Sequence, residues 1–262
     1  MEEPEEKIAD KYILREFIGK GKFGSVYKGK KIGIDEKIVA IKFEAKNADI
    51  PLLKKETRIL EYLARNGLQD VPIIYWYGLH RKEYICVVMS YLGEMTLTTM
   101  TESTSFSLES WFHSAISILE KIHLYGVIHR DLKPEHFLFY NGKWKIIDFG
   151  FACFVSDENK SFENREYVIG TPNYISYNVH LGKEPGKKDD MVSLGYIFLE
   201  KYRGLSWTST STLYLENPEN YPVNHLLHPV NQCKQSLKEP DLFFKEISDI
   251  PFLTKYMRKY YF

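Results

Sequence analysis

Residues 129–150 read His-Arg-Asp-Leu-Lys-Pro-Glu-His, then two apolar-rich runs on either side of Asn-Gly, and finally Asp-Phe-Gly. Asn141-Gly142 is the strongest two-residue signal for a tight β-hairpin, and it joins residues 137–140 to residues 143–147. The stretch therefore predicts a hairpin with carboxylate and imidazole side chains next to its open end.

The two-residue turn also predicts the register of this hairpin. Because the turn pairs Tyr140 with Lys143, counting outward places His136 beside Asp148, with neighbouring side chains about 5 to 8 Å apart. Asp131 lies in the loop that leads into the first strand. A carboxylate, an imidazole and a second carboxylate are thus expected at one end of the hairpin, where they could bind a metal ion and a phosphate.

Both motifs of this stretch resemble parts of the eukaryotic protein kinases, the first their catalytic loop and the second their metal-binding turn. The resemblance implies an α+β fold with two lobes, a small antiparallel β-sheet lobe plus a helix and a larger, mainly α-helical lobe. The implied organisation is an acidic N-terminal tail (1–11) and a protein kinase domain (12–262), which is divided into an N-lobe (12–89), a hinge (90–93) and a C-lobe (94–262).

The composition narrows the classes of function. The 262 residues include 35 basic and 35 acidic ones, so the net charge is zero. It therefore does not indicate a nucleic acid or a membrane surface as partner. Cys86, Cys153 and Cys233 are scattered and odd in number, as expected of reduced intracellular thiols. The chain starts with acidic residues, unlike a signal peptide, and no apolar stretch reaches about 18 residues. We expect a protein of the cytoplasm, the nucleus or both, and we expect it to be a monomer.

A glycine-rich segment, Gly19-Lys20-Gly21-Lys22-Phe23-Gly24, has the spacing of a phosphate-binding loop. Dinucleotide-binding folds use the same spacing, and Glu44 lies at about the position of their ribose-binding acid. Those folds need a helix directly after the last glycine, whereas residues 25–32 alternate like a β-strand. In kinases, strand, glycine loop and strand form a flap over the phosphates. The resemblance assigns to ATP binding Ile18, Gly19, Lys20, Gly21, Lys22, Phe23, Gly24, Ser25 and Val26.

Lys42 ends an apolar strand pattern, and the element that follows offers it a partner. Pro51 suits a helix start and Gly67 a helix stop. Between them, Glu56 shares one helix face with the apolar side chains of Leu52, Ile59 and Leu63. A carboxylate on an apolar stripe needs a partner, which argues against Lys42 being an edge lysine that points to water. In kinases this Lys-Glu pair holds the lysine against the α- and β-phosphates of ATP.

Two further strands are predicted at residues 71–77 and 84–89, and they lead into the hinge. By the resemblance, adenine lies against the hinge, with Met89 controlling the depth of access and Leu92 among the ATP-binding residues. Met89 also suits a plain core position.

Two long helices are predicted in the second lobe. Residues 107–125 are amphipathic, and residues 189–203 are apolar nearly all round, as expected of a core helix. By the resemblance, the Asp190 carboxylate ties down the backbone of the catalytic loop.

The segment that includes residues 176–196 carries a closer resemblance, to the casein kinase I group. It begins with Ser-Tyr-Asn-Val-His-Leu-Gly and continues to Lys-Lys-Asp-Asp-Met-Val-Ser-Leu-Gly-Tyr. Most kinases carry Ala-Pro-Glu near the start of this segment, and this chain does not. This likeness covers about residues 12–207. Casein kinase I enzymes have Arg where this chain has Asn173, so we do not expect a preference for acidic or phosphorylated substrates.

The resemblance implies a serine/threonine protein kinase that transfers the γ-phosphoryl group of ATP to protein substrates. Asp131 would orient the hydroxyl and accept its proton, and Lys133 would neutralise charge on the moving group. Asp148 would chelate Mg²⁺. Lys133 after Asp131 is the pattern of serine/threonine rather than tyrosine kinases.

His136 departs from the kinase pattern, which places at this position an Asn that ligates a second magnesium. An imidazole nitrogen suits Mn²⁺ better than Mg²⁺, so His136 is a candidate metal ligand, and either activity with one tightly held magnesium or a manganese preference would follow. The same departure favours an alternative function, a pseudokinase that binds nucleotide or partners without chemistry. The joint presence of Lys42, Glu56, Asp131, Lys133 and Asp148 favours an active enzyme.

Overall fold

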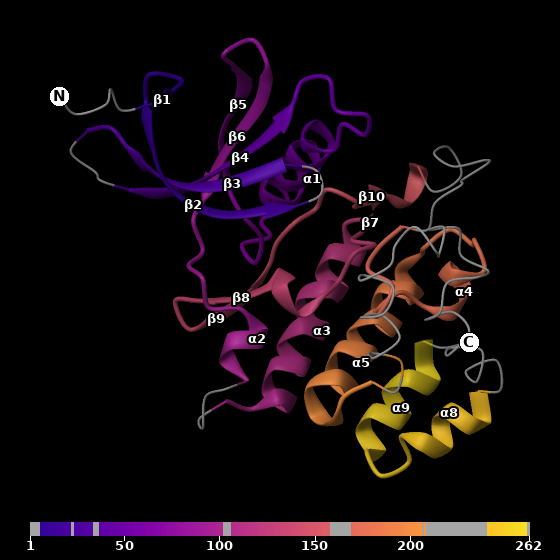
Figure 1. Ribbon diagram of the computed structural model, residues 1–262. Helices are drawn as coiled ribbons and strands as arrows, with labels where there is room; N and C mark the ends of the chain where they lie inside the picture. Colours follow the sequence, from indigo (N-terminus) through magenta and orange to yellow (C-terminus); the bar gives the residue numbers. More distant parts are fainter. Residues whose placement is uncertain are drawn as a thin grey trace. The chain divides into compact units, whose positions relative to one another are not determined.

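The computed structural model describes residues 6–21, 24–33, 37–101, 106–157, 169–205, 207 and 240–260 (Figure 1). They belong to two compact units, which are treated separately below. Unit 1 comprises Met1–Met95 and Leu138–Gly150, and unit 2 comprises Thr96–Phe137 and Phe151–Phe262. Residues 138–150, which the sequence-based boundaries place in the C-lobe, thus group with the first unit.

Unit 1 is built on an antiparallel sheet of six strands in the order β1-β2-β3-β4-β6-β5. Successive side chains of a strand point to opposite faces, so each strand contributes side chains to both faces of the sheet. The strands are β1 (Lys7–Ile8), β2 (Tyr12–Gly21), β3 (Gly24–Lys31), β4 (Ile38–Ala45), β5 (Ile74–His80) and β6 (Tyr84–Ser90).

The two faces of the sheet carry separate apolar clusters. On one face, Val87 and Met89 pack with Leu53 of the helix α1 (Leu53–Arg65). The other face carries a cluster that includes Ile8 and Tyr12. Residues 7 and 8 thus lie within the predicted N-terminal tail but form a strand that pairs with β2. Burial of the Ile8 side chain, which is fully buried, holds this strand on the sheet.

The predicted hairpin is present as β8 (Phe137–Tyr140) and β9 (Lys143–Ile146). Asn141 and Gly142 have positive φ angles of 50° and 73°, as a two-residue hairpin turn requires. The hairpin is bound within unit 1, because Phe139 N donates to Met95 O (2.8 Å) and Ile146 N donates to Asp70 O (2.9 Å).

His136 lies outside this hairpin. It ends a 3₁₀ turn, η1 (Pro134–His136), in which its backbone N–H donates to Lys133 O (3.0 Å). The counting that places His136 in the strand register is therefore wrong, because Pro134 opens this turn before the strand begins.

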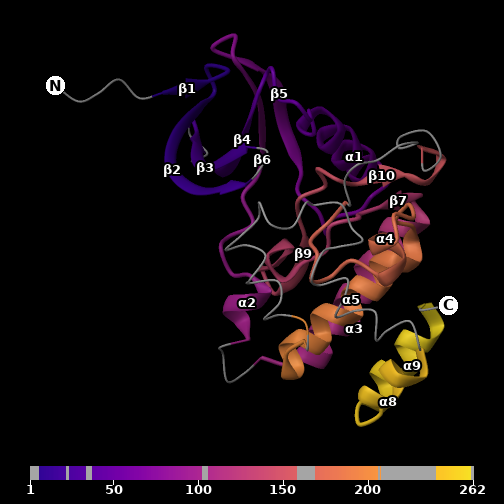
Figure 2. The same ribbon diagram turned by 45° about the vertical axis from the view of Figure 1, so that its right-hand side comes forward.

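Unit 2 is mainly helical, and α5 packs against both α3 and α9 (Figures 1 and 2). Ser107 caps α3 by accepting a hydrogen bond from Ser110 N, and α5 buries a continuous run from Asp190 to Leu199. The elements of the described residues are α2 (Leu97–Met100), α3 (Leu108–Leu124), β7 (Val127–Ile128), β10 (Cys153–Phe154), η2 (Val155–Asp157), α4 (Tyr177–His180), α5 (Lys187–Arg203), α8 (Pro240–Glu246) and α9 (Pro251–Tyr260).

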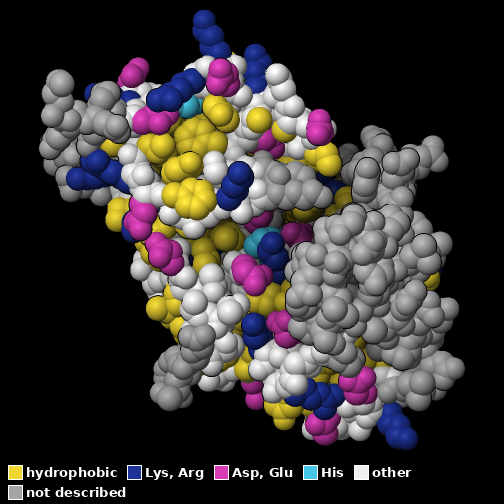
Figure 3. Space-filling model, viewed as in Figure 1, with side chains coloured by type: hydrophobic (Ala, Val, Ile, Leu, Met, Phe, Trp, Pro, Cys, Tyr) yellow, Lys and Arg dark blue, Asp and Glu magenta, His cyan; other side chains and the backbone are white. Residues whose placement is uncertain are grey.

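The described helices are too short or too polar for a membrane span. On the face shown in Figure 3, the described side chains of both charge signs are interspersed.

Asp190, in the first turn of α5, fixes the catalytic-loop motif of unit 2. Its buried carboxylate accepts hydrogen bonds from His129 N, Arg130 N and His123 Nε2, each 2.8 Å long. Arg130 has a positive φ of 68°, which is uncommon outside glycine. The backbone bonds to Asp190 hold it in that conformation, as the resemblance to kinases implies.

We predict that Asp190→Asn destabilises the protein by roughly 3 kcal/mol, because an amide NH₂ would face donors that now bind a charged oxygen. Urea unfolding followed by circular dichroism measures this loss. Asp249→Asn is the matched control, because Asp249 is an exposed acid that pairs with Arg203, and its effect should stay within about 0.5 kcal/mol. Equal unfolding midpoints for the two variants would contradict the assignment.

The stability that Asp190 contributes should depend on pH. Burial alone would raise the pKa of this carboxyl, but the hydrogen bond and charge of His123 and the contacts with His129 lower it below its usual value. A carboxylate with a lowered pKa stabilises the folded state above the unfolded-state pKa, about 3.9 for Asp. The stability gap between the wild type and Asp190→Asn should therefore hold at neutral pH and narrow as the pH falls below about 4. A urea series at stepped pH measures the gap, and a gap that widens on acidification would refute this role.

Candidate active site

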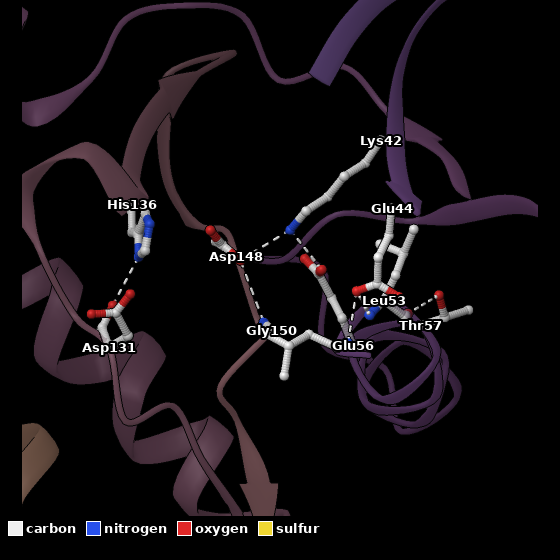
Figure 4. A network of polar contacts seen from close by, with 10 residues as sticks. Lys42, Glu44, Leu53, Glu56, Thr57, Asp131, His136, Asp148 and Gly150 are labelled. Atoms are coloured by element: carbon white, nitrogen blue, oxygen red, sulfur yellow. Dashed lines mark hydrogen bonds and ion pairs between the residues drawn. The ribbon is translucent and has the colours of Figure 1, made fainter. Parts of the chain in front are cut away.

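Lys42 lies at the centre of a partly buried ion-pair network in unit 1. Its Nζ donates to Glu56 Oε2 (2.7 Å) and to Asp148 Oδ1 (3.1 Å), as Figure 4 shows. The predicted pairing of Lys42 with Glu56 is therefore present, and Asp148 joins it. Their roles toward ATP stay predictions.

The network keeps the lysine charged. Burial alone would lower the pKa of Lys42, but the carboxylates of Glu56 and Asp148 outweigh that effect and raise it above the ordinary lysine value. Glu56 is only 2% exposed, so its charge is met by Lys42 rather than by water. The result is a rigidly held ammonium group, which is a suitable partner for phosphate oxygens.

The two ends of the glycine segment lie on neighbouring strands of unit 1. Gly19 pairs with Val26, Lys20 with Ser25 and Gly21 with Gly24 across β2 and β3. A strand and not a helix follows the last glycine, which rules out the dinucleotide-binding alternative. Ile18 lies on β2, whereas Lys22 and Phe23 lie outside the described residues.

Gly24, the first residue of β3, allows this strand to approach β4 closely. A Cβ atom at this position would lie 2.1 Å from the backbone oxygen of Phe43. Only glycine therefore fits without moving β3 away from β4, which carries Lys42.

The hinge residues lie at the end of β6 and just beyond it. Met89 is buried, pairs with Ala40 across the strands and packs with Leu53, which confirms the core reading. Leu92 is also buried, and Gly93 has a positive φ of 79°. A contact of Met89 and Leu92 with adenine stays a prediction.

Asp131 of unit 2 is held through both its side chain and its backbone. The Thr171 hydroxyl donates to Asp131 Oδ1 (2.7 Å), which orients the carboxylate. Asp131 O lies 2.8 Å from Nδ1 of His136, a contact drawn in Figure 4, and a carbonyl can only accept, so we assign the proton to Nδ1. Lys133 is half-buried with an extended backbone.

Sequence reasoning missed two of these contacts. No pattern along the chain singles out Thr171 as a partner of Asp131, because 40 positions separate them. The second is the bond of His123 to Asp190, a partner that cannot be read from helical spacing because 67 positions separate the two residues.

The metal-binding assignment rests on Asp148. Among the described residues, no group of three or more His, Cys, Asp or Glu side chains could hold a metal ion alone. Mg²⁺ does not need such a cage, since one or two carboxylates and the phosphates of the substrate are its usual ligands. The Asp148 side chain is 42% exposed and therefore reachable, so it fits this mode of binding.

The structure thus brings the predicted residues together in two groups, each within its own unit. Lys42, Glu56 and Asp148 meet in unit 1. Asp131 and His136 meet in unit 2, together with Thr171.

Comparison with known proteins agrees with this arrangement. The chain is 32% identical over 212 residues to the Kluyveromyces lactis protein casein kinase I homolog RAG8, an alignment that covers 75% of this chain and 39% of that relative. The chain thus spans about two fifths of the length of that relative. The protein kinase domain family matches residues 12–247, which is most of the sequence. The chain belongs to the protein kinase family.

Proposed function

We propose that this protein is an active serine/threonine kinase that resembles the casein kinase I group and phosphorylates protein substrates. The observation that carries the proposal is the bonding of Lys42 to both Glu56 and Asp148. Burying the charges of Lys42 and Glu56 costs free energy, and a fold that only needed stability would do as well with apolar side chains at these two positions. A fixed ammonium group beside a carboxylate suits the binding of nucleotide phosphates and a metal ion.

ATP would bind unit 1 through the backbone amides of the glycine segment and through Lys42, which would hold the α- and β-phosphates. Met89 and Leu92 would contact the adenine. Asp148 would hold Mg²⁺ together with the phosphates, and the bound ion would neutralise phosphate charge and orient the outer phosphates.

Asp131 would act on the protein substrate. In the transfer, the oxygen of a serine or threonine hydroxyl forms a bond to the γ-phosphorus, and the bond from that phosphorus to the bridging oxygen of ADP breaks. The hydroxyl proton passes to Asp131, whose carboxylate Thr171 already orients. Lys133 would neutralise charge on the moving phosphoryl group.

The specificity for serine and threonine rests on two features. Lys133 follows Asp131 at the spacing found in serine/threonine kinases. The similarity to a casein kinase I homolog supports the same class.

We predict that Asp131→Ala lowers the rate of phosphate transfer from labelled ATP to casein by at least about a hundredfold, because the variant lacks the proton acceptor. Binding of ATP, measured by calorimetry, should persist. Glu135→Ala is the matched control, since this exposed acid lies four positions away in the same loop, and it should keep the wild-type rate.

The competing function is that of a pseudokinase, and His136 in place of the usual Asn favours it. Absence of transfer by the wild type with either Mg²⁺ or Mn²⁺, while ATP still binds, would support the pseudokinase and refute the kinase. Transfer that survives Asp131→Ala unchanged would refute the proposed role of Asp131.

His136 is proposed to shift the choice of metal. Its Nδ1 bond to Asp131 O fixes the ring, and a histidine ligand commonly donates its second ring N–H to a carbonyl in this way. We predict that His136→Asn raises the ratio of the rate with Mg²⁺ to the rate with Mn²⁺, since an amide oxygen suits magnesium better than an imidazole nitrogen.

The matched control for this variant is His113→Asn, because His113 is an exposed histidine on α3. It should leave the metal ratio unchanged. If His136→Asn alters neither the rate nor the ratio, the position does not contact a metal ion.

A further inference from the structure

Glu44 is a buried carboxylate on β4 to which the kinase resemblance assigns no role. It is only 4% exposed, and its Oε2 accepts two backbone hydrogen bonds, from Leu52 N (2.7 Å) and Leu53 N (2.9 Å). Both donors lie at the start of α1, as Figure 4 illustrates for Leu53. A charge that is removed from water must be met by such donors, so this contact is specific and costly to lose.

The helix α1 has no N-terminal cap of its own. Its N-cap position is Leu52, whose side chain cannot accept a hydrogen bond. The first backbone N–H groups of any helix lack partners within the helix. Glu44 supplies an acceptor from a neighbouring strand, and its negative charge faces the positive end of the helix dipole.

Glu44 and Lys42 are two positions apart on β4, so their side chains emerge on the same face of the sheet. Both reach the first turn of α1, where Lys42 binds Glu56 while Glu44 binds Leu52 N and Leu53 N. Glu56 closes this first turn, since its N–H donates to Leu52 O (2.9 Å). A rotation or slide of the helix would break both attachments together.

We propose that Glu44 is a positioning residue that holds the start of α1 where Glu56 can pair with Lys42. In this role it acts through the ion pair and not on the substrate or the reacting atoms. This inference rests on the proposed function for its effect on catalysis, while the capping contact itself needs no nucleotide.

Amide hydrogen exchange tests the capping contact directly. In Glu44→Ala, the amides of Leu52 and Leu53 should exchange at least about tenfold faster, since each loses a bond to a charged oxygen. Exchange in β6 should stay unchanged, which separates local release of the helix from general unfolding. Glu44→Gln keeps one oxygen acceptor at the same reach and should give intermediate rates.

Nucleotide affinity tests the consequence for the site. Glu44→Ala should raise the KM for ATP, or its Kd measured by calorimetry, by about fivefold or more, with Glu44→Gln in between. The matched control is Glu61→Ala, which removes an acid from the outer side of the same helix, where it pairs with Arg65. It should change neither the exchange nor the affinity.

Two results would overturn the positioning role. One is that the amides of Leu52 and Leu53 exchange in Glu44→Ala at the same rate as in the wild type. If the alanine variant does not fold, the same result in Glu44→Gln counts instead. The other is faster exchange without any change in ATP affinity. A wild type that neither binds ATP nor transfers phosphate would refute the proposed function instead, and the exchange comparison would still decide whether Glu44 holds the start of α1.

Discussion

A carboxylate that is removed from water must be met by hydrogen bonds or a positive charge, and this constraint organises both units of the protein. In unit 1, Glu56 is met by the Lys42 ammonium group and Glu44 by the first backbone amides of α1. In unit 2, Asp190 is met by two backbone amides and the ring of His123. Each contact joins elements that are distant in the sequence, so each fixes tertiary structure as well as satisfying a charge.

These contacts also explain how strained backbone is held at the two motifs that define the site. Arg130 and Asp148 have positive φ angles of 68° and 63°, which cost on the order of 1–3 kcal/mol each for residues other than glycine. The backbone N–H of Arg130 binds Asp190, and the Asp148 carboxylate binds Lys42. Both residues flank the chemistry that we propose, so the strain coincides with the positions whose geometry matters most.

Local patterns explain which parts of the molecule could be predicted from the sequence. The hairpin follows from Asn141-Gly142, and the partner of Lys42 follows from a carboxylate on an apolar helix stripe. Both of these sequence signals involve elements that follow one another directly along the chain. The strand at residues 7 and 8 escaped prediction because a two-residue strand has no periodicity, and it is recognisable only from the burial of Ile8.

The candidate site shows the same limit. Spacing along the chain marks Lys42, Asp131 and Asp148, whereas the contact of Thr171 with Asp131 and the cap that Glu44 provides depend on tertiary structure. A glutamate near the end of a strand looks like an ordinary solvated residue until the helix that it caps is in place. The predicted position of His136 is wrong for another reason, because the strand register does not extend into the turn that begins at Pro134.

The division of unit 1 into two chain segments has a consequence for folding during synthesis. The sheet and α1 emerge from the ribosome first, but the hairpin that completes the unit follows only after residues 96–137, which belong to unit 2. Until then, Met95 O and Asp70 O lack the donors that the hairpin supplies, and Lys42 lacks its bond to Asp148. A nascent chain that ends before residue 148 can thus contain the whole sheet and still lack part of the Lys42 network, so the phosphate site that we propose is completed late in translation.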